Sequence, residues 1–247
     1  MQIQGSIALV TGANRGLGKA FAEALLARGA ARVYAGTRNA SPEAGAMGAD
    51  ARLVPVQLDV TSAADVAAVG SRCPDVTLLI NNAGIMLMAP MLKGGSDDAL
   101  RREMEVNVFG MLSMTRAFAP ILGKNGGGAV VNMLSVVSWF TVPFSATYCA
   151  SKHAALVVSD AARIELRRQK TQVVGVYAGY IDTDMAASVD QPKTAPREIA
   201  DRALDGVEKR LDHVLADARA EEIWRQTRES PAQLAKLQQL AWETRPK

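Results

Sequence analysis

The stretch Ile7-Ala8-Leu9-Val10-Thr11-Gly12-Ala13-Asn14-Arg15-Gly16-Leu17-Gly18 decides the fold of this chain. Its first four residues form an apolar run typical of a buried strand, and a helical pattern of apolar residues begins at Ala20. Strand, glycine turn and helix, in that order, let backbone N–H groups approach a pyrophosphate at the positive end of a helix. The spacing is G-x-x-x-G-x-G rather than G-x-G-x-x-G, and a plain strand-to-helix turn is the alternative. The residues expected to contact a dinucleotide here are Gly12, Asn14, Arg15, Gly16, Leu17 and Gly18.

The second expected strand, Arg32–Ala35, leads into Gly36-Thr37-Arg38. No acid stands there to hold the hydroxyls of an adenosine ribose, whereas Arg38 offers a positive charge to a 2′-phosphate. Arg15 in the glycine turn offers a second one. We therefore expect NADP(H) rather than NAD(H), with Thr37 and Arg38 in the pocket; two solvated surface arginines are the alternative.

Asp59 and Val60 follow the next apolar run, Leu53–Val56, and are expected at the same edge of the sheet. At that edge a short acid such as Asp59 can touch the adenine. Capping of the following helix explains Asp59 equally well, because it precedes Thr61 and Ser62.

Composition favours one domain over residues 1–247. A chain of 247 residues with 49% hydrophobic content can bury a sizeable core. The net charge of +3 comes from 28 basic and 25 acidic residues without a long block of one sign, so neither nucleic acid nor a membrane is an expected partner. Two cysteines and two histidines carry no metal-ligand spacing, and no metal is expected. The cysteines also lack a disulfide framework, and we expect a cytoplasmic protein.

A second constellation carries the chemistry. Ser135 ends the apolar run Ala129–Leu134, so its hydroxyl should emerge at the carboxyl end of a strand. Tyr148 and Lys152 lie four residues apart, which places them about 40° apart on a helix and one turn along. A neighbouring ammonium favours the phenolate, so we expect Lys152 to lower the pKa of Tyr148 and make it an acid/base. A packed tyrosine beside a solvated lysine is the ordinary alternative.

The four motifs together resemble the short-chain dehydrogenase/reductase family, classical type. They are Thr11–Gly18, the Asn81-Asn82-Ala83-Gly84 stretch after the apolar run Val76–Ile80, Ser135, and the Tyr148/Lys152 pair, and the resemblance extends to about Asp217. It implies an α/β fold, a doubly wound parallel sheet (Rossmann fold) of about seven strands with helices on both faces. It also implies a dimer or tetramer in which long helices pair across subunits.

The resemblance assigns further roles. Asn81, Ala83 and Gly84 would line the cofactor cleft, and Asn107 would hold a water through its backbone carbonyl and so complete a proton relay with Lys152. Ile181 and Thr183 would hold the nicotinamide carboxamide. The family usually has Pro-Gly before these two residues, and here Ala178 replaces the proline.

Three segments complete the expected architecture. Asp97–Ala119 should be one helix ended by Pro120, residues 184–196 a mobile lid over the substrate, and residues 230–242 a helical tail used in subunit packing. Apolar residues near the cleft, among them Ile85–Met88 and Trp139, suit an apolar substrate, although core packing explains many of them.

The sequence thus predicts an NADPH-dependent oxidoreductase that interconverts a carbonyl and an alcohol. Asn107, Ser135, Tyr148 and Lys152 are the expected catalytic residues. A nucleotide-binding regulator that kept the fold and lost turnover is the alternative, against which the presence of all four residues argues.

Overall fold

The sheet has seven parallel strands in the order β3-β2-β1-β4-β5-β6-β7. The computed structural model describes residues 1–39, 50–92 and 94–244. The strands are β1 (Ile7–Thr11), β2 (Arg32–Thr37), β3 (Leu53–Gln57), β4 (Leu78–Asn81), β5 (Gly128–Met133), β6 (Thr171–Tyr177) and β7 (His213–Leu215). The predicted doubly wound parallel sheet is confirmed. Pro55 lies in β3, at the edge of the sheet, where its missing N–H costs no ladder bond between two strands.

Each central strand is apolar on both sides because helices cover both faces of the sheet. Side chains alternate along a strand, so Ala8 and Val10 of β1 pack into one core while Leu9 packs into the other. The first core also contains residues of α1 and α6, and the second contains residues of α2 and α4.

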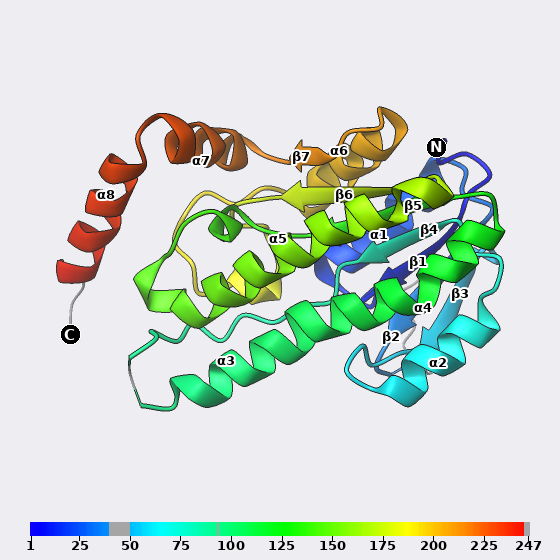
Figure 1. Cartoon of the computed structure of the whole chain (residues 1–247), viewed down its shortest axis with the longest axis horizontal. Helices are drawn as coiled ribbons and strands as arrows, with labels where there is room; N and C mark the ends of the chain where they lie inside the picture. Colours follow the sequence, from blue (N-terminus) through cyan, green and yellow to red (C-terminus); the bar gives the residue numbers. More distant parts are fainter. Residues whose placement is uncertain (40–49, 93, 245–247) are drawn as a thin grey trace.

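The helices lie in two layers around this sheet, with α4 and α5 side by side across one face (Figure 1). Their bounds are α1 (Gly16–Ala27), α2 (Ala63–Arg72), α3 (Ser96–Met104), α4 (Met111–Lys124), α5 (Ala146–Leu166), α6 (Pro196–Glu208), α7 (Ala218–Glu229) and α8 (Pro231–Glu243). Short helical turns are η1 (Glu105–Gly110), η2 (Val136–Ser138), η3 (Pro143–Ser145), η4 (Arg167–Gln169) and η5 (Asp184–Ala186).

The order of strands reverses between β1 and β4. On one side of this point the chain proceeds to β2 and β3, and on the other to β5, β6 and β7. In an open parallel sheet the loops that leave such neighbours separate, and ligands bind in the crevice beyond their carboxyl ends. The glycine turn follows β1 and Asn81-Asn82-Ala83-Gly84 ends β4, so two of the four motifs meet at this crevice.

The expectation of one regular helix ended by Pro120 is wrong in two respects. A π-helical turn, η1, separates α3 from α4, and α4 contains Pro120 and continues to Lys124. A proline inside a helix removes one backbone hydrogen bond but need not end the helix when the surrounding packing holds it. Here Phe118 and Leu122 on either side of Pro120 are fully buried in the core between α4 and the sheet.

The continuous helical stretch Ser96–Lys124 also bears on the expectation that a membrane is not a partner. Among the described residues it is long and apolar enough to span a membrane, judged by length and composition alone. Its apolar side packs against the sheet, and 44% of its most apolar window is buried. Buried core helices commonly have this length and composition, so these two properties alone do not distinguish a core helix from a membrane-spanning helix.

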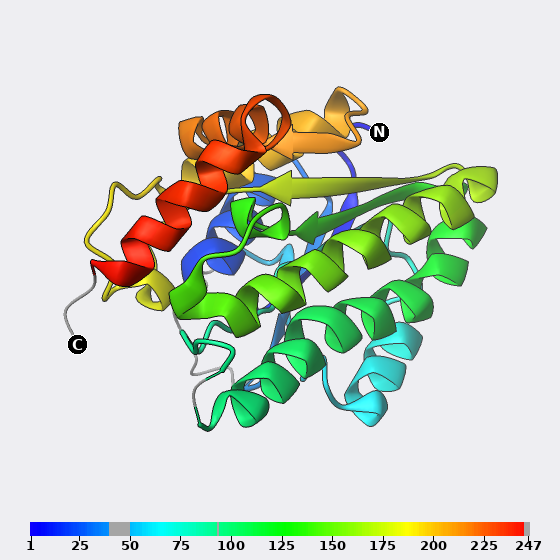
Figure 2. The same ribbon diagram turned by 60° about the vertical axis from the view of Figure 1, so that its left-hand side comes forward.

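The C-terminal part closes the carboxyl edge of the sheet. Helix α8, predicted as a tail, leaves α7 and lies beside the N-terminal end of α5 (Figure 2), where Trp242 stacks on Phe144 with ring centroids 5.3 Å apart. Helix α7 was not predicted. The segment predicted as a lid begins with η5 and is tied at its far end by a bridge between Ile181 and Thr194, so its base is fixed.

Candidate active site

The glycine turn packs too closely for side chains. Gly12 and Gly16 have φ of +66° and +52°, in the left-handed region that favours glycine. A β-carbon at Gly18 would lie 2.1 Å from the Gly12 carbonyl oxygen. Thr11 fixes the turn to the other side of the crevice, because its Oγ1 accepts hydrogen bonds from the backbone N–H groups of Asn82 and Ala83, both at 2.9 Å. These close approaches form a cradle in which backbone N–H groups can bind a pyrophosphate.

Thr11 and Asn82 were not among the predicted contact residues. Asn82 Nδ2 donates to the Thr11 carbonyl at 2.9 Å and the Gly12 carbonyl at 3.3 Å. The two residues therefore join the ends of β1 and β4. The sequence carried part of the signal, because a polar residue stands at the carboxyl end of each of these two strands. Their pairing could be predicted only once the strands were known to be neighbours.

The expected adenosine pocket lies at the carboxyl ends of β2 and β3. Thr37 is buried, and in the part of the chain that the structure describes its Oγ1 has no hydrogen-bond partner. Arg38 is exposed. Hydrogen bonds from Thr61 are the main cause of the lowered pKa of the Asp59 carboxyl, and the charge of Arg38 lowers it further. Asp59 accepts from Thr61 Oγ1 at 2.7 Å, while Ser62 rather than Asp59 caps α2. An orphan hydroxyl beside an exposed arginine is a fitting environment for a phosphorylated ribose.

Arg15 does not point freely into this pocket. Its Nη1 lies 2.7 Å from Asp184 Oδ2, and the side chains of Arg15 and Asp184 are 70% and 74% exposed. The pair joins the glycine turn to the segment after β6. So exposed a pair contributes little to stability and can open readily. Of the two arginines that the sequence grouped together, Arg15 thus has a carboxylate partner of its own.

The loop after β6 reaches the glycine turn, as expected for residues that hold a nicotinamide. A β-carbon at Gly16 would lie 3.1 Å from Thr183 Cγ2, so Thr183 is against the cradle. Asp217 holds this loop by accepting from the Gly179 N–H at 2.8 Å, and the Ala178 carbonyl accepts from the Val136 N–H at 3.1 Å. The turn is therefore anchored on both sides although Ala178 replaces a proline.

Asn81 differs from the neighbouring cleft residues. Its Nδ2 donates to Asn132 Oδ1 at 2.9 Å and to Thr115 Oγ1 at 3.1 Å, inside the core. Its side chain therefore links β4, β5 and α4, and a role toward the cofactor is left to its backbone.

Ser135 and Tyr148 meet at the end of β5. Ser135 caps η2, accepts from the Val137 N–H at 3.4 Å and donates to the Ala178 carbonyl at 3.4 Å. Tyr148 lies on the first turn of α5 and is half-buried. Burial raises the pKa of the Tyr148 phenol, and a hydrogen bond with the Ser135 hydroxyl opposes that rise. The two hydroxyls are thus close enough to share one oxygen atom of a ligand.

The expected lowering of the pKa of Tyr148 is wrong in its direction. The pKa of Tyr148 is raised, because burial disfavours the charged phenolate. Lys152 Nζ lies 5.7 Å from the centre of the Tyr148 ring and donates to the Met133 carbonyl at 2.8 Å. Burial also lowers the pKa of Lys152 to about 8. At neutral pH the phenol is therefore a protonated acid, and the lysine still carries its charge.

Asn107 lies in the π-helical turn η1, which the sequence did not reveal. Its side chain accepts from the Ile85 N–H at 2.8 Å and donates to the Ile85 carbonyl and to Ser151 Oγ, both at 2.9 Å. A β-carbon at Gly84 would lie 3.1 Å from Asn107 Oδ1 and 3.9 Å from Lys152 Nζ. Asn107, Gly84 and Lys152 therefore converge. Single π turns inside α-helices are frequent at functional sites.

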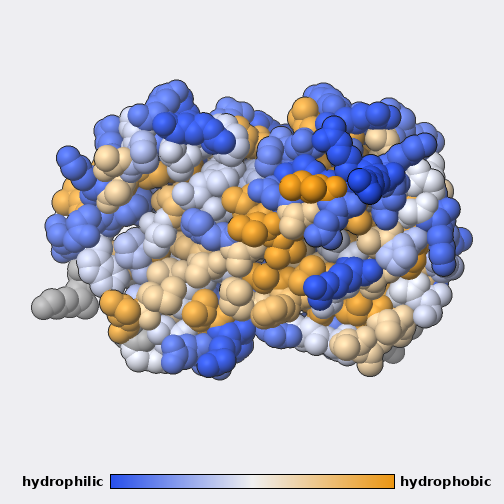
Figure 3. Space-filling model, viewed as in Figure 1, coloured by the Kyte–Doolittle hydropathy of each residue, from blue (hydrophilic) through white to orange (hydrophobic). Residues whose placement is uncertain are grey.

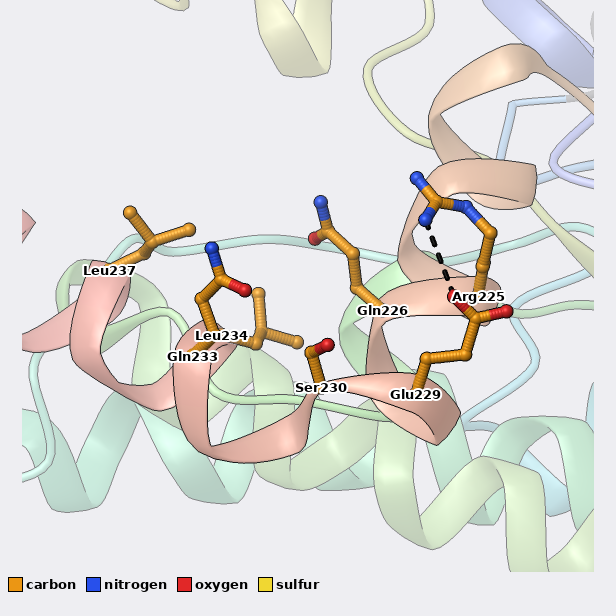
Figure 4. A pocket seen from close by; sticks show the side chains of 7 residues that line it. All are labelled: Arg225, Gln226, Glu229, Ser230, Gln233, Leu234 and Leu237. Carbon is orange, nitrogen blue, oxygen red and sulfur yellow. Dashed lines mark hydrogen bonds and ion pairs between the residues drawn. The ribbon is translucent and has the colours of Figure 1, made fainter.

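Two hollows lie beside the C-terminal helices. One, of about 400 Å³, is lined by Trp139, Phe140 and Pro143 of the loop after Ser135, together with residues of α7 and α8. The other, of about 210 Å³, lies between α7 and α8 and is largely polar, with Arg225 paired to Glu229 at 3.4 Å (Figure 4). Only the first adjoins the loop that carries Ser135.

The residues present fit a dinucleotide. Backbone N–H groups line a cradle that a β-carbon would fill, and the buried Thr37 hydroxyl at the end of β2 has no partner among the described residues. Residues 6–194 match the family model for short chain dehydrogenases. The chain belongs to the short-chain dehydrogenase family.

Relatives of this short-chain dehydrogenase act on different substrates. It is 31% identical over 197 residues to galactitol 2-dehydrogenase of Agrobacterium fabrum, covering 77% of this chain and 76% of that protein. A crystal structure of a short-chain dehydrogenase from Burkholderia cenocepacia J2315 in complex with NADP is 44% identical, with a TM-score of 0.92 over 96% of this chain and 99% of that one. A gluconate 5-dehydrogenase of the same organism, in complex with NADP and tartrate, is 25% identical, with a TM-score of 0.78 over 87% and 94% of the two chains. The chain is therefore an oxidoreductase with a nucleotide cofactor.

Proposed function

We propose that this short-chain dehydrogenase uses NADP(H) to interconvert a ketone or aldehyde and the corresponding alcohol, with Tyr148 as the acid/base. The observation that carries the proposal is the meeting of the Ser135 and Tyr148 hydroxyls beside Lys152, at the end of the crevice that begins with the glycine cradle. The crystal structure of the relative with NADP supports the choice of cofactor.

Each residue has a distinct part in the proposed reduction. When bound, the reduced nicotinamide supplies a hydride to the carbonyl carbon, and the protein supplies binding and electrostatics. Ser135 orients the carbonyl oxygen, and Tyr148 gives that oxygen its proton. The raised pKa of Tyr148 suits this direction, because the phenol is protonated before the reaction begins. The Lys152 ammonium stabilises the negative charge left on the phenolate.

Asn107 contributes through geometry. Its side chain is occupied by Ile85 and Ser151, which leaves its backbone carbonyl, in the π turn, as the group that would hold a water beside Lys152. Through that water a proton lost by Tyr148 would be replaced from solvent. We propose Asn107 as the anchor of this relay on these grounds.

The proposed substrate is a small molecule with an apolar part. Trp139 and Phe140 line the hollow beside the Ser135 loop, and Met88 and Met185 are 41% and 46% exposed. Methionine side chains adapt to different shapes, which suits a permissive apolar pocket. We also propose a cytoplasmic location, in keeping with two buried free cysteines, Cys73 and Cys149.

The variant Tyr148→Phe tests the proposal. It keeps the ring and removes the proton donor, so kcat should fall by about 10²–10⁴-fold. The Kd for NADPH, measured by fluorescence titration, should stay within about twofold. Turnover is followed as NADPH oxidation with ketones and aldehydes, including benzaldehyde and cyclohexanone.

The matched control is Tyr180→Phe, which removes the hydroxyl of a second tyrosine that is exposed to solvent. It should keep turnover near the wild-type value. Near-normal turnover of Tyr148→Phe would refute the assigned role. If the wild-type protein binds NADPH but none of the carbonyl compounds causes it to oxidise the cofactor, the result would point to the nucleotide-binding regulator instead.

A further inference from the structure

One buried acid beside the site has no part in the reaction described so far. Glu103 lies on α3, four residues before Asn107, and is fully buried. Its Oε1 accepts from the Leu87 N–H at 2.7 Å, and its Oε2 has no hydrogen-bond partner within the described residues. Burial raises the pKa of the Glu103 carboxyl, and the Leu87 N–H and the Thr147 hydroxyl oppose that rise. A carboxyl placed at such cost calls for a reason.

Glu103 is the middle member of a regular set of tethers. Asn107 holds both backbone groups of Ile85, Glu103 holds the N–H of Leu87, and Thr147 donates to the carbonyl of Ala89 from its N–H and its Oγ1, both at 3.3 Å. Alternate residues of the segment 85–89 are thus tied to α3, η1 and α5. The spacing suits this pattern, because one step of four residues along a helix advances about 6 Å and two residues of an extended chain about 6.6 Å.

The tethered segment passes the turn of α5 that carries Tyr148. It starts next to Gly84, where a β-carbon would lie 3.9 Å from Lys152 Nζ, and it ends at Ala89, which is bonded to Thr147. Lys152 and Thr147 lie on either side of Tyr148 in the sequence. Glu103 also interacts with Tyr148 through its charge. The segment 85–89 therefore runs beside the turn of α5 that carries the phenol.

We propose that Glu103 is a positioning residue of the reaction, which fixes the segment Ile85–Ala89 as the wall beside Tyr148 and so sets where the carbonyl substrate sits. This inference rests on the proposed function for its effect on turnover, while the tether itself can be measured without a substrate. Glu103 does not touch the cofactor cradle, so cofactor binding should be independent of it.

Three variants test the proposal. Glu103→Met keeps the bulk but removes the acceptor of the Leu87 N–H, and kcat/KM for benzaldehyde should fall about tenfold or more. Glu103→Gln keeps an oxygen acceptor and should restore kcat/KM to within about threefold of the wild-type value. Glu105→Gln is the matched control, because it makes the same charge change on an exposed residue two positions along and should have no effect. The Kd for NADPH should stay within about twofold in all three.

Hydrogen exchange supplies the readout that needs no substrate. In Glu103→Met the amides of residues 85–89 should exchange about tenfold faster than in Glu105→Gln, and Glu103→Gln should exchange at the slower rate. If Glu103→Met does not fold, Thr147→Val, which removes the Oγ1 contact to Ala89, should show the same changes in a weaker form.

Two outcomes would overturn the proposal. One is unchanged exchange at residues 85–89 in Glu103→Met, which would mean that Glu103 does not hold the segment. The other is faster exchange with an unchanged kcat/KM, which would mean that the segment does not position the substrate. If the wild-type protein reduces no carbonyl, the proposed function fails and the role in turnover fails with it, whereas the exchange result still decides whether Glu103 tethers the wall.

Discussion

The charge of Lys152 is the feature of the site that pH alters first. Its ammonium is buried and lies 2.8 Å from the Met133 carbonyl, and among the described residues it has no carboxylate partner to hold the proton. Burial therefore acts on it unopposed and lowers its pKa to about 8. Tyr148, one turn earlier, is shifted by burial in the opposite sense, toward the protonated form. The shift of Tyr148 favours the protonated phenol, and a Lys152 pKa of about 8 still leaves most of the amine charged at neutral pH, which is the state that reduction requires.

A pH profile should show the loss of this ammonium. Because the pKa of Lys152 is lowered to about 8, the charge is present below that pH and disappears above it. We expect kcat/KM for NADPH-dependent reduction to be level up to about pH 8 and then to fall by up to tenfold per pH unit. Steady-state rates from pH 6 to pH 10 would measure this, and a profile that stays level to pH 10 would contradict it.

Arg38 should decide between the two cofactors. It is exposed beside the buried Thr37 hydroxyl, whereas Arg15 is paired with Asp184. Arg38→Asp should raise the Kd for NADPH by about 10–100-fold and favour NADH, because a charge-assisted bond is replaced by repulsion. Arg72→Asp, the same change on another exposed arginine, is the control. An unchanged ratio of the Kd values for NADPH and NADH would show that Arg38 does not bind the phosphate.

Among the elements, two local irregularities place the site. The π turn η1 interrupts the helical stretch from Ser96 to Lys124 at Asn107, and the tight glycine turn leads directly from β1 into α1. Each sets a backbone group in an unusual place, a carbonyl in η1 and a row of N–H groups in the cradle. Neither element works alone, because Asn107 holds the loop after β4 and Thr11 joins β1 to the same loop.

The close packing of the glycine turn can be tested with two alanine variants. Gly18→Ala would place a β-carbon 2.1 Å from the Gly12 carbonyl, so we expect a loss of about 1–3 kcal/mol of stability and at least about tenfold weaker NADPH binding. Gly70→Ala in α2 meets nothing within 4 Å and should stabilise the protein by up to about 1 kcal/mol. Denaturant unfolding and NADPH titration measure both. Equal stability of the two variants would mean that the cradle yields to a side chain.

At the scale of the whole molecule, one face is unusually apolar. Figure 3 shows an apolar band across the face on which Figure 1 places α4 and α5. The exposed large apolar side chains of this region include Phe109 in η1 and Val157 and Ile164 in α5, at 50%, 68% and 76% exposure. Apolar surface of this kind commonly marks an interface. This favours a homodimer or homotetramer in which the long helices pair, as the family resemblance implied.

Charges placed on this face should prevent assembly. Val157→Glu and Ile164→Glu each add a charge where a partner would bury the side chain, so we expect a shift toward monomer in sedimentation velocity. Leu211→Glu is the control, because Leu211 is 44% exposed but lies in the turn before β7 rather than on this face. Variants that sediment like the wild-type oligomer, or a wild-type protein that is already monomeric, would contradict the proposed interface.

The sequence by itself determined the fold family and much of the order of the elements, and it singled out the residues that we expect to be catalytic. Glycines at Gly12, Gly16 and Gly18 impose a local backbone, and the spacing of Tyr148 and Lys152 is a property of any helix, so both could be read without the tertiary structure. The family resemblance carried by these motifs implied the seven parallel strands and the helices at both faces. These features depend on neighbours in the sequence, which is why the pattern suffices.

Only the tertiary structure decided what depends on residues far apart in the chain. Burial reversed the expected pKa shift of Tyr148, Asp184 paired with Arg15, and core packing carried α4 past Pro120. Glu103 shows the limit most clearly, because its role comes from a backbone N–H sixteen residues away and from a site that water does not reach. Desolvation and long-range contacts are set by the assembled fold, and a local pattern carries no record of either.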